Sequence, residues 1–181
     1  IVHTIEHFEK NPEIDAVVVV CVEDWIEYFN SLVYKFRLDK VVKVVPGGES
    51  GQLSIYNGLK AAKEIVSNEE AIVLIHDGVR PLINSELLSK NIACVKQFGS
   101  SITSAIVKET IVEILDDGEI KNVPDRAHSR VAKAPQCFWL NDILETHEKA
   151  LAEGKKDFID SCSMMQYYGY RLHMTDGPYE N

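Results

Sequence analysis

Short apolar runs alternate with amphipathic segments along most of the chain, and this alternation limits the fold more than any other feature of the sequence. The run from Ala16 to Val22 is continuous and rich in β-branched residues, which is typical of a strand buried on both faces. Such strands, each followed by a helix, predict a three-layer α/β fold in which helices cover both faces of a mostly parallel sheet. The predicted strands are residues 16–22, 41–45, 71–75 and 102–107, and the predicted helices are residues 1–10, 24–36, 54–66 and 85–98.

The alternation breaks at about residues 110–123, where two short stretches flank a turn. Thr110 to Leu115 alternates in polarity, Asp116-Asp117-Gly118 is a turn signal, and Ile120 to Val123 resumes the pattern, which together predict a β-hairpin. Two short strands cannot bury their own apolar residues. We therefore expect a β-arm that protrudes from the α/β unit and packs on a second copy of the chain in a two-fold homodimer.

The sequence after the arm returns to the α/β pattern. Because the residue before a proline avoids the helical region, Ala134 to Phe138 is predicted to be extended. Helices are predicted at residues 140–153 and about 159–168, and a last strand at 171–175. Residues 1–181 are therefore expected to form one domain that carries the arm as an insertion.

The charge of the chain excludes some partners. It contains 19 Lys and Arg residues and 28 Asp and Glu residues, for a net charge of −9, whereas proteins that coat nucleic acid normally carry a basic stripe. Its apolar runs are far shorter than the ~20 residues of a membrane span. We therefore expect neither nucleic acid nor a membrane among its partners. The four cysteines form no C-x-x-C pair, which favours reduced thiols in a cytoplasmic protein.

A glycine pair follows the second predicted strand. Pro46-Gly47-Gly48-Glu49 lies directly after that strand, and Ser54 follows near the start of the next helix. Ligands of open parallel sheets bind beyond the carboxyl ends of the strands. Glycines let the backbone approach a ligand, and a hydroxyl at a helix start can meet a polar ring or a phosphate. A plain strand-to-helix turn would have the same pattern.

A second loop carries a carboxylate directly after the third predicted strand, in His76-Asp77-Gly78-Val79-Arg80-Pro81. A carboxylate in this position is a common ligand of Mg²⁺, which prefers oxygen donors. Arg80 could bind a phosphate through its fork of donors, or pair with Asp77 in a salt bridge within the loop. His76 is interpreted as a structural imidazole.

Basic residues gather directly after the arm, in Asp125-Arg126-Ala127-His128 and at Lys133. In an acidic chain such a cluster favours an anionic substrate. The alternative is a solvated charged loop in which Arg126 pairs with Asp125 or Asp117. The sequence has no G-x-S-x-G, H-E-x-x-H, C-x-x-C or Walker motif, so none of the chemistries that depend on them is predicted.

Together these motifs resemble the cytidylyltransferases that act on polyol phosphates, a family that includes the ribitol-5-phosphate enzyme of wall and capsule polymers and the 2-C-methyl-D-erythritol 4-phosphate enzyme of isoprenoid synthesis. The resemblance implies a Rossmann-like nucleotidyltransferase fold and an enzyme that transfers CMP from CTP to a polyol phosphate with Mg²⁺ as cofactor. Val79 and residues 123–128 and 160–162 favour ribitol 5-phosphate, and the erythritol substrate is the alternative. The anchors of the resemblance are Gly47-Gly48 with Ser54, residues 76–81, Asp125-Arg126 ahead of Pro135-Gln136, and Gly177 to Asn181.

The resemblance also implies a role for each matching residue. Asp77 matches the metal ligand, and Arg80 matches a residue that supports this loop beside the substrate. Thr110 and Arg126 match groups that reach from the arm of a neighbouring subunit and grip the polyol phosphate, and Arg126 is counted among the catalytic residues. The residues that match nucleotide-binding positions are Gly48, Glu49, Ser54 and Gly78.

Some parts of the family pattern differ here or are expected outside the chain. Gly51 stands where the family commonly has Arg. The glycine-rich triphosphate loop, with its Arg and Lys, is expected before Ile1, and a further Lys is expected after Asn181. Two alternatives stay open: a sugar-phosphate nucleotidyltransferase that uses another nucleoside triphosphate, and a non-catalytic nucleotide-binding domain of the same fold.

Overall fold

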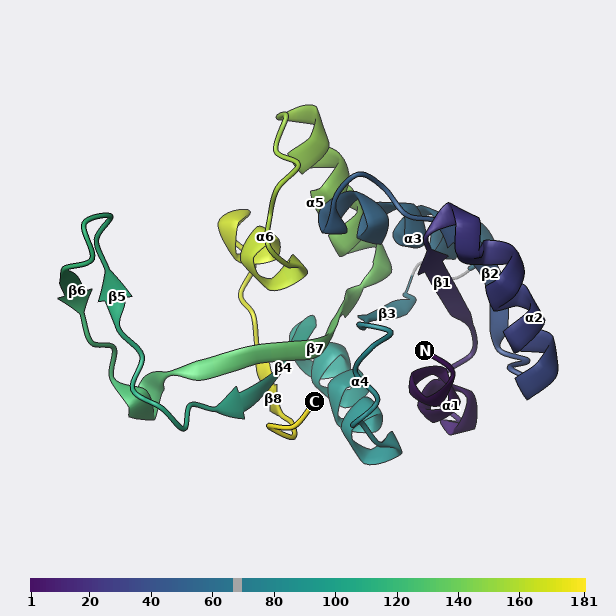
Figure 1. Ribbon diagram of the computed structural model, residues 1–181, viewed down its shortest axis with the longest axis horizontal. Coiled ribbons are helices and arrows are strands. Elements are labelled where there is room, and N and C mark those ends of the chain that lie inside the picture. Colours follow the sequence, from purple (N-terminus) through teal and green to yellow (C-terminus); the bar gives the residue numbers. More distant parts are fainter. Residues whose placement is uncertain (67–69) are drawn as a thin grey trace.

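The computed structural model describes residues 1–66 and 70–181, and Figure 1 shows the course of the chain. The strands outside the arm are β1 (Val17–Cys21), β2 (Val41–Pro46), β3 (Ile72–Ile75), β4 (Ser100–Ile106), β7 (Arg130–Trp139) and β8 (Met174–Asp176). The main sheet has the order β3-β7-β4-β8, and β1 and β2 form a separate parallel pair. Because β3, β4 and β8 run in one direction and β7 runs against them, the mostly parallel sheet is confirmed with β7 as its exception.

Helices connect these strands where the alternation predicts them. They are α1 (Val2–Lys10), α2 (Ile26–Phe36), α3 (Gly51–Ile65), α4 (Ser85–Phe98), α5 (Leu140–Ala152) and α6 (Ser161–Tyr167), with 3₁₀ turns η1 (Glu23–Trp25) and η2 (Arg126–His128). Within the described residues, none of these helices combines the length and the apolar character that a membrane span requires.

Side-chain caps decide where three of the helices begin. The side chains of Ser50, Asn84 and Asp160 each accept a hydrogen bond from a backbone N–H in the first turn of α3, α4 and α6, respectively. These bonds satisfy donors that the first turn of a helix leaves unpaired. Because Asp160 is the cap, α6 starts one residue after it, and Ile159, which the sequence places in the helix, lies outside and almost fully exposed.

The main sheet is buried on both faces, as β3 shows residue by residue. Ile72 and Leu74 pack against a cluster formed by α1 and α4, which includes the fully buried Leu88. Val73 and Ile75 pack against the opposite cluster, to which α3, α5 and α6 contribute. In Figure 1, α5 and α6 accordingly lie on one side of the sheet and α4 on the other. The predicted three layers are confirmed.

The segment after the arm is a longer strand than the sequence predicts. Extended structure is expected at Ala134 to Phe138, whereas β7 begins at Arg130, because its outer half pairs with β4 as far as Ile106. Conversely, β8 begins at Met174 rather than at the expected Arg171.

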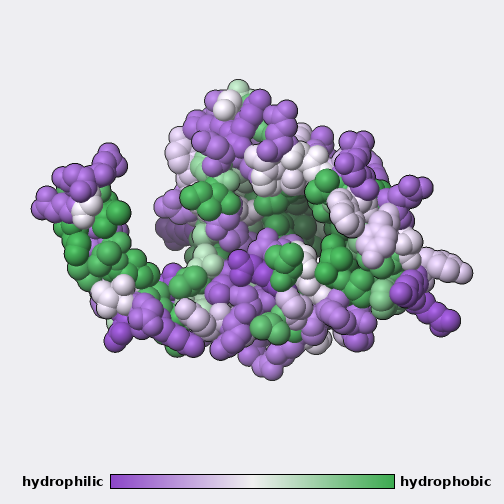
Figure 2. Space-filling view, viewed as in Figure 1, coloured by the Kyte–Doolittle hydropathy of each residue, from purple (hydrophilic) through white to green (hydrophobic). Residues whose placement is uncertain are grey.

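The predicted β-arm protrudes from this body. β5 (Glu113–Ile114) pairs in antiparallel fashion with β6 (Ile120–Asn122), and Gly118 occupies the turn at φ 90°, which a glycine adopts without strain. Figure 1 shows the arm at the end of the molecule opposite α2, and Figure 2 shows apolar side chains gathered along it. The exposed apolar residues of the arm are Ile111, Val112, Ile114, Leu115, Ile120 and Val123.

Candidate active site

The predicted nucleotide loop lies between β2 and α3. The Ser54 hydroxyl accepts a hydrogen bond from the Gly48 N–H at 3.0 Å and donates to the Ser50 carbonyl at 2.9 Å. The structure therefore brings Gly48 and Ser54 together, as the sequence predicts. Glu49 lies exposed in the same loop, with its carboxylate available to a ligand.

Close packing requires a glycine at position 48. A Cβ atom there would lie 2.5 Å from the Cβ of Leu53, a separation that two non-bonded carbons cannot reach without a backbone shift. The preceding Gly47 donates its N–H to the carbonyl of Cys21, at the end of β1, at 2.9 Å. The loop thus joins the ends of β1 and β2 to the first turn of α3 and leaves its own backbone exposed for a ligand.

The turn after β3 is closed by its own hydrogen bonds. The Arg80 N–H donates to the Asp77 carbonyl at 3.0 Å, and Arg80 Nε donates to Asp77 Oδ2 at 2.6 Å. The His76 Nε2 atom lies 2.8 Å from the Arg80 carbonyl oxygen. The salt bridge that the sequence left as an alternative is therefore present. Its side chains are 41% exposed at Arg80 and 57% at Asp77, so both charges remain within reach of a ligand.

The carboxylate of Asp77 suits a metal ion that binds together with other oxygen ligands, such as phosphate oxygens and water. In the part of the chain that the structure describes, no cluster of three or more His, Cys, Asp or Glu side chains could hold a metal. Mg²⁺ in nucleotide sites usually takes one or two carboxylates and completes its shell with phosphate oxygens and water. The single exposed carboxylate of Asp77 fits that chemistry and does not fit a zinc-type centre.

Arg126 lies at the base of the arm, as the first residue of η2. Its Nη1 donates to the Lys108 carbonyl at 3.5 Å. Asp125 Oδ2 instead lies 2.5 Å from His128 Nδ1, and this hydrogen bond is the main reason why the pKa of Asp125 is lowered. The predicted alternative, in which Arg126 pairs with Asp125 or Asp117, is not found among residues 1–66 and 70–181.

The site residues fall into two groups within one chain. Thr110 is exposed just ahead of β5, and Arg126 lies where the arm returns to β7. Gly48 and Asp77 lie in loops of the body that follow β2 and β3, and Ser54 lies in the first turn of α3. Figure 1 places the arm at one end of the molecule, β1 and β2 toward the other end and β3 between them, so the arm of a single chain points away from the body loops.

Two lysines lie near one tyrosine ring, a cluster that sequence reasoning missed. Nζ of Lys108 lies 4.1 Å, and Nζ of Lys133 5.1 Å, from the ring centroid of Tyr179. Lys133 also donates to the carbonyls of Tyr179 and Asn181, at 2.8 and 2.7 Å. The only signal in the sequence is that Lys133 belongs to the basic stretch after the arm, since its partner Tyr179 comes 46 residues later.

Gln136 and Asp160, two residues quoted in the resemblance, meet at the start of α6. Gln136 Nε2 donates to Asp160 Oδ2 at 2.9 Å, and Gln136 Oε1 accepts from the Cys162 N–H at 2.8 Å. Burial raises the pKa of Asp160, but the hydrogen bonds from Ser163 and Gln136 outweigh it and lower the pKa overall. β7 thus fixes the first turn of α6 through one amide side chain.

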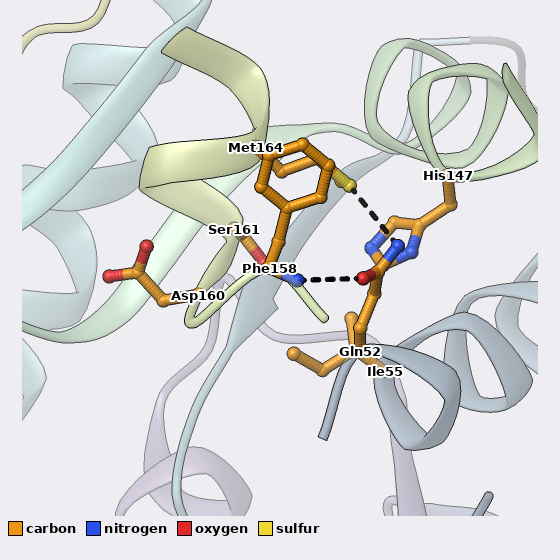
Figure 3. A pocket seen from close by; sticks show the side chains of 7 residues that line it. All are labelled: Gln52, Ile55, His147, Phe158, Asp160, Ser161 and Met164. Atoms are coloured by element: carbon orange, nitrogen blue, oxygen red, sulfur yellow. Dashed lines mark hydrogen bonds between the residues drawn. The ribbon is translucent and has the colours of Figure 1, made fainter. Parts of the chain in front are cut away.

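A small cavity lies between α3, α5 and α6, and Figure 3 shows its lining. Its volume of about 10 Å³ is at the lower limit for holding a single water molecule, so it is no site for a nucleotide. His147 is buried in this lining, and burial lowers its pKa to about 4. Neither ring nitrogen of His147 has a hydrogen-bond partner among the described residues. The residues that line the cavity are Gln52, Ile55, His147, Phe158, Asp160, Ser161 and Met164.

Known proteins match nearly the whole of this chain in sequence and in structure. The family model described as 2-C-methyl-D-erythritol 4-phosphate cytidylyltransferase matches residues 1–181. Ribitol-5-phosphate cytidylyltransferases of Streptococcus agalactiae serotype III (strain NEM316) and Vibrio parahaemolyticus serotype O3:K6 are 52% and 50% identical over the whole of this chain, which covers 75% and 76% of their lengths. A 2-C-methyl-D-erythritol 4-phosphate cytidylyltransferase of Clostridium botulinum (strain Langeland) is 37% identical over 99% of this chain and 76% of its own length.

Solved structures give the same result. The crystal structure of 4-diphosphocytidyl-2C-methyl-D-erythritol synthase from Anaerococcus prevotii superposes with a TM-score of 0.87 at 26% identity, and the match covers 99% of this chain and 77% of that one. The fold and the matching relatives define a nucleotidyltransferase. The chain belongs to the 2-C-methyl-D-erythritol 4-phosphate cytidylyltransferase family, which confirms the resemblance seen in the sequence.

The low pKa of His147 predicts that the stability of the protein falls in acid. The pKa of an unfolded histidine is about 6.5, whereas that of folded His147 is about 4, so the unfolded chain binds the proton more readily. The free energy of unfolding should therefore drop as the pH falls between these values, by roughly 1 kcal/mol per pH unit from this group. Urea unfolding at a series of pH values measures it.

The matched variants for this test are His147→Phe and His3→Phe. His147→Phe keeps a ring but cannot be protonated, so its stability should depend less on pH than that of the wild type. His3 is 88% exposed, and His3→Phe should keep the wild-type dependence. Parallel curves for the wild type and His147→Phe between pH 6.5 and pH 4 would contradict the assignment to His147.

Proposed function

We propose that this protein transfers CMP from CTP to ribitol 5-phosphate and releases pyrophosphate and CDP-ribitol. The choice of polyol rests on sequence identity. The chain is 52% and 50% identical to ribitol-5-phosphate cytidylyltransferases, but 37% identical to a 2-C-methyl-D-erythritol 4-phosphate cytidylyltransferase. The erythritol substrate is the second candidate, because the family model carries its name.

The reaction needs positioning and charge neutralisation more than proton transfer. An oxygen of the polyol phosphate attacks the α-phosphorus of CTP, a P–O bond forms, and the bond to pyrophosphate breaks. A phosphate is already anionic at neutral pH, so no strong general base is required. The loop after β3 fits this chemistry, since it offers a carboxylate and a guanidinium while its imidazole, His76, is occupied by the Arg80 carbonyl.

The body of the chain supplies the CTP side of the proposed site. The exposed backbone at Gly48, the carboxylate of Glu49 and the Ser54 hydroxyl suit the cytosine and ribose, and Gly78 lets the chain pass close to the nucleotide. Asp77 would hold Mg²⁺ together with triphosphate oxygens, and the bound ion would neutralise charge on the triphosphate. Arg80 lies beside this carboxylate, where its guanidinium can support the loop and meet an anion.

The arm supplies the polyol side of the proposed site in a two-fold homodimer. Six apolar residues of the arm are exposed, and a hairpin of this size is marginal without a partner surface. Packing of the arm on a second copy would bury them and carry Thr110 and Arg126 to the neighbouring body. The fork of Arg126 would then hold the polyol phosphate in bidentate fashion.

A substrate panel tests the proposed reaction. The full-length protein should release pyrophosphate from CTP with ribitol 5-phosphate at a higher kcat/KM than with 2-C-methyl-D-erythritol 4-phosphate, and ATP, GTP and UTP should be poor replacements for CTP. A preference for the erythritol substrate would select the second candidate. Binding of CTP without turnover of either polyol would instead identify a non-catalytic nucleotide-binding domain.

Asp77→Asn should lower turnover by on the order of 10²-fold or more while the protein still folds, because it removes the charge that holds the metal. Steady-state rates across a range of Mg²⁺ concentrations measure this effect. Asp176→Asn, at the exposed end of β8, is the control for loss of one carboxylate. Near-normal rates for Asp77→Asn at ordinary Mg²⁺ levels would show that the metal ligand lies elsewhere.

Arg126→Ala should raise KM for the polyol phosphate and lower kcat while CTP binding stays nearly intact. Arg126→Lys should restore activity only in part, since an ammonium cannot reproduce the fork. Arg130 is a matched control, because it is exposed nearby and its guanidinium donates to the backbone carbonyls of Ala127 and Ser129. Arg130→Ala should leave KM unchanged.

Mixed dimers decide whether Arg126 acts on the neighbouring subunit. Inactive Arg126→Ala chains mixed with inactive Asp77→Asn chains should regain activity, because each mixed dimer contains one site with both residues intact. Mass spectrometry verifies that the chains exchange. Exchange without recovery of activity would place Arg126 in its own subunit's site or outside catalysis.

A further inference from the structure

Helix α1 lies along the turn that carries Asp77. The Thr4 hydroxyl donates a hydrogen bond to the Gly78 carbonyl at 2.8 Å, across 74 residues of sequence, and Thr4 is only 3% exposed. At the other end of α1, the buried Asn11 donates through Nδ2 to Ser85 Oγ at 2.9 Å. The helix is therefore bonded to both ends of the segment between Gly78 and Ser85.

His76 fixes the same turn from the end of β3. Its Nε2 lies 2.8 Å from the Arg80 carbonyl, which can only accept, so the proton of the imidazole must be on Nε2. The ring also packs against Phe8 of α1, with 5.4 Å between centroids. Nδ1 is buried and has no partner within the described residues, so the bond to Arg80 is the one that directs the ring.

These two contacts hold the backbone on both sides of Asp77. Thr4 holds the residue after it, and His76 spans the turn from the residue before it to Arg80. The Asp77 carbonyl in turn accepts from the Arg80 N–H. A carboxylate on a backbone fixed in this way loses less freedom when it binds, which favours the bound geometry before the ligand arrives.

We propose that Thr4 and His76 are positioning residues that set the Asp77 carboxylate for a divalent cation bound with a nucleoside triphosphate. The proposal rests on the proposed role of Asp77 and deepens it. Neither residue touches the nucleotide; both act through the backbone of the turn. The competing explanation is that they contribute only to the stability of the fold, as any buried hydrogen bond does.

Two pairs of variants separate these explanations in the full-length protein. Thr4→Val and His76→Phe remove the hydrogen bond but keep most of the volume, whereas Thr4→Ser and His76→Gln keep a donor. Thr146→Val is the matched control, because Thr146 is 4% exposed and its hydroxyl donates to the Asp142 carbonyl at 2.7 Å within α5. It makes the same chemical change as Thr4→Val, away from the turn.

Three measurements apply to every variant. Calorimetry gives Kd for CTP with Mg²⁺ and with EDTA, hydrogen exchange reports the protection of the Arg80 amide, and steady-state assays give kcat and KM. Thr4→Val and His76→Phe should weaken binding of Mg²⁺–CTP by about tenfold, a typical loss when a group that orients a metal ligand is removed. They should leave binding in EDTA unchanged and speed exchange at Arg80, and the Ser and Gln variants should recover most of both losses.

The outcomes that would overturn the proposal are concrete. The proposal fails if Thr4→Val and His76→Phe keep the wild-type affinity for Mg²⁺–CTP and the wild-type protection of the Arg80 amide. It also fails if Thr146→Val loses as much affinity and protection as they do. If His76→Phe does not fold, the two Thr4 variants and the control decide alone. A wild type that binds Mg²⁺–CTP but converts no polyol phosphate would refute the proposed reaction, while the calorimetry and exchange results would still judge the positioning roles.

Discussion

The structure depends on the double pairing of β7. This strand is hydrogen-bonded to β3 along one edge and to β4 along the other, and Cys137 and Phe138 near its C-terminal end are fully buried. Its first residue follows the arm, and its last precedes α5. The loop after β3 and the arm are therefore both placed relative to this one strand, and Gln136 of β7 also fixes the first turn of α6.

Local sequence was sufficient to predict most helices and strands, but it was not sufficient to predict β7. Local runs of β-branched residues indicate β1 to β4, and a local turn signal at Gly118 indicates the arm. The layers and the arm could therefore be predicted. β7 contains Lys133 and Pro135 within ten residues, which breaks the apolar pattern. Its ladder with β4 is irregular between Ile102 and Ser104. Direction and register of such a strand come from distant partners, which periodicity does not encode.

The same distinction between local patterns and long-range contacts applies to the candidate site. Gly48, Ser54, Asp77 and Arg126 could be proposed from motifs, because each lies in a short segment that comes after a strand. Their contacts could not, since the Thr4 hydroxyl reaches Gly78 across 74 residues and the two lysines near Tyr179 come from two segments distant from it in sequence. Such contacts require the whole fold, so the sequence can propose which groups form the site but not what holds them in place.

The ion pair between Asp77 and Arg80 has a consequence for how the loop would receive the proposed cation. Both side chains are about half exposed, so the pair contributes at most about 1 kcal/mol and is easily exchanged. A cation that arrives at Asp77 would replace one positive partner by another, and the carboxylate would never lose its counter-charge during the exchange. The displaced guanidinium would remain tethered three residues away, free to follow the anion that the cation brings with it.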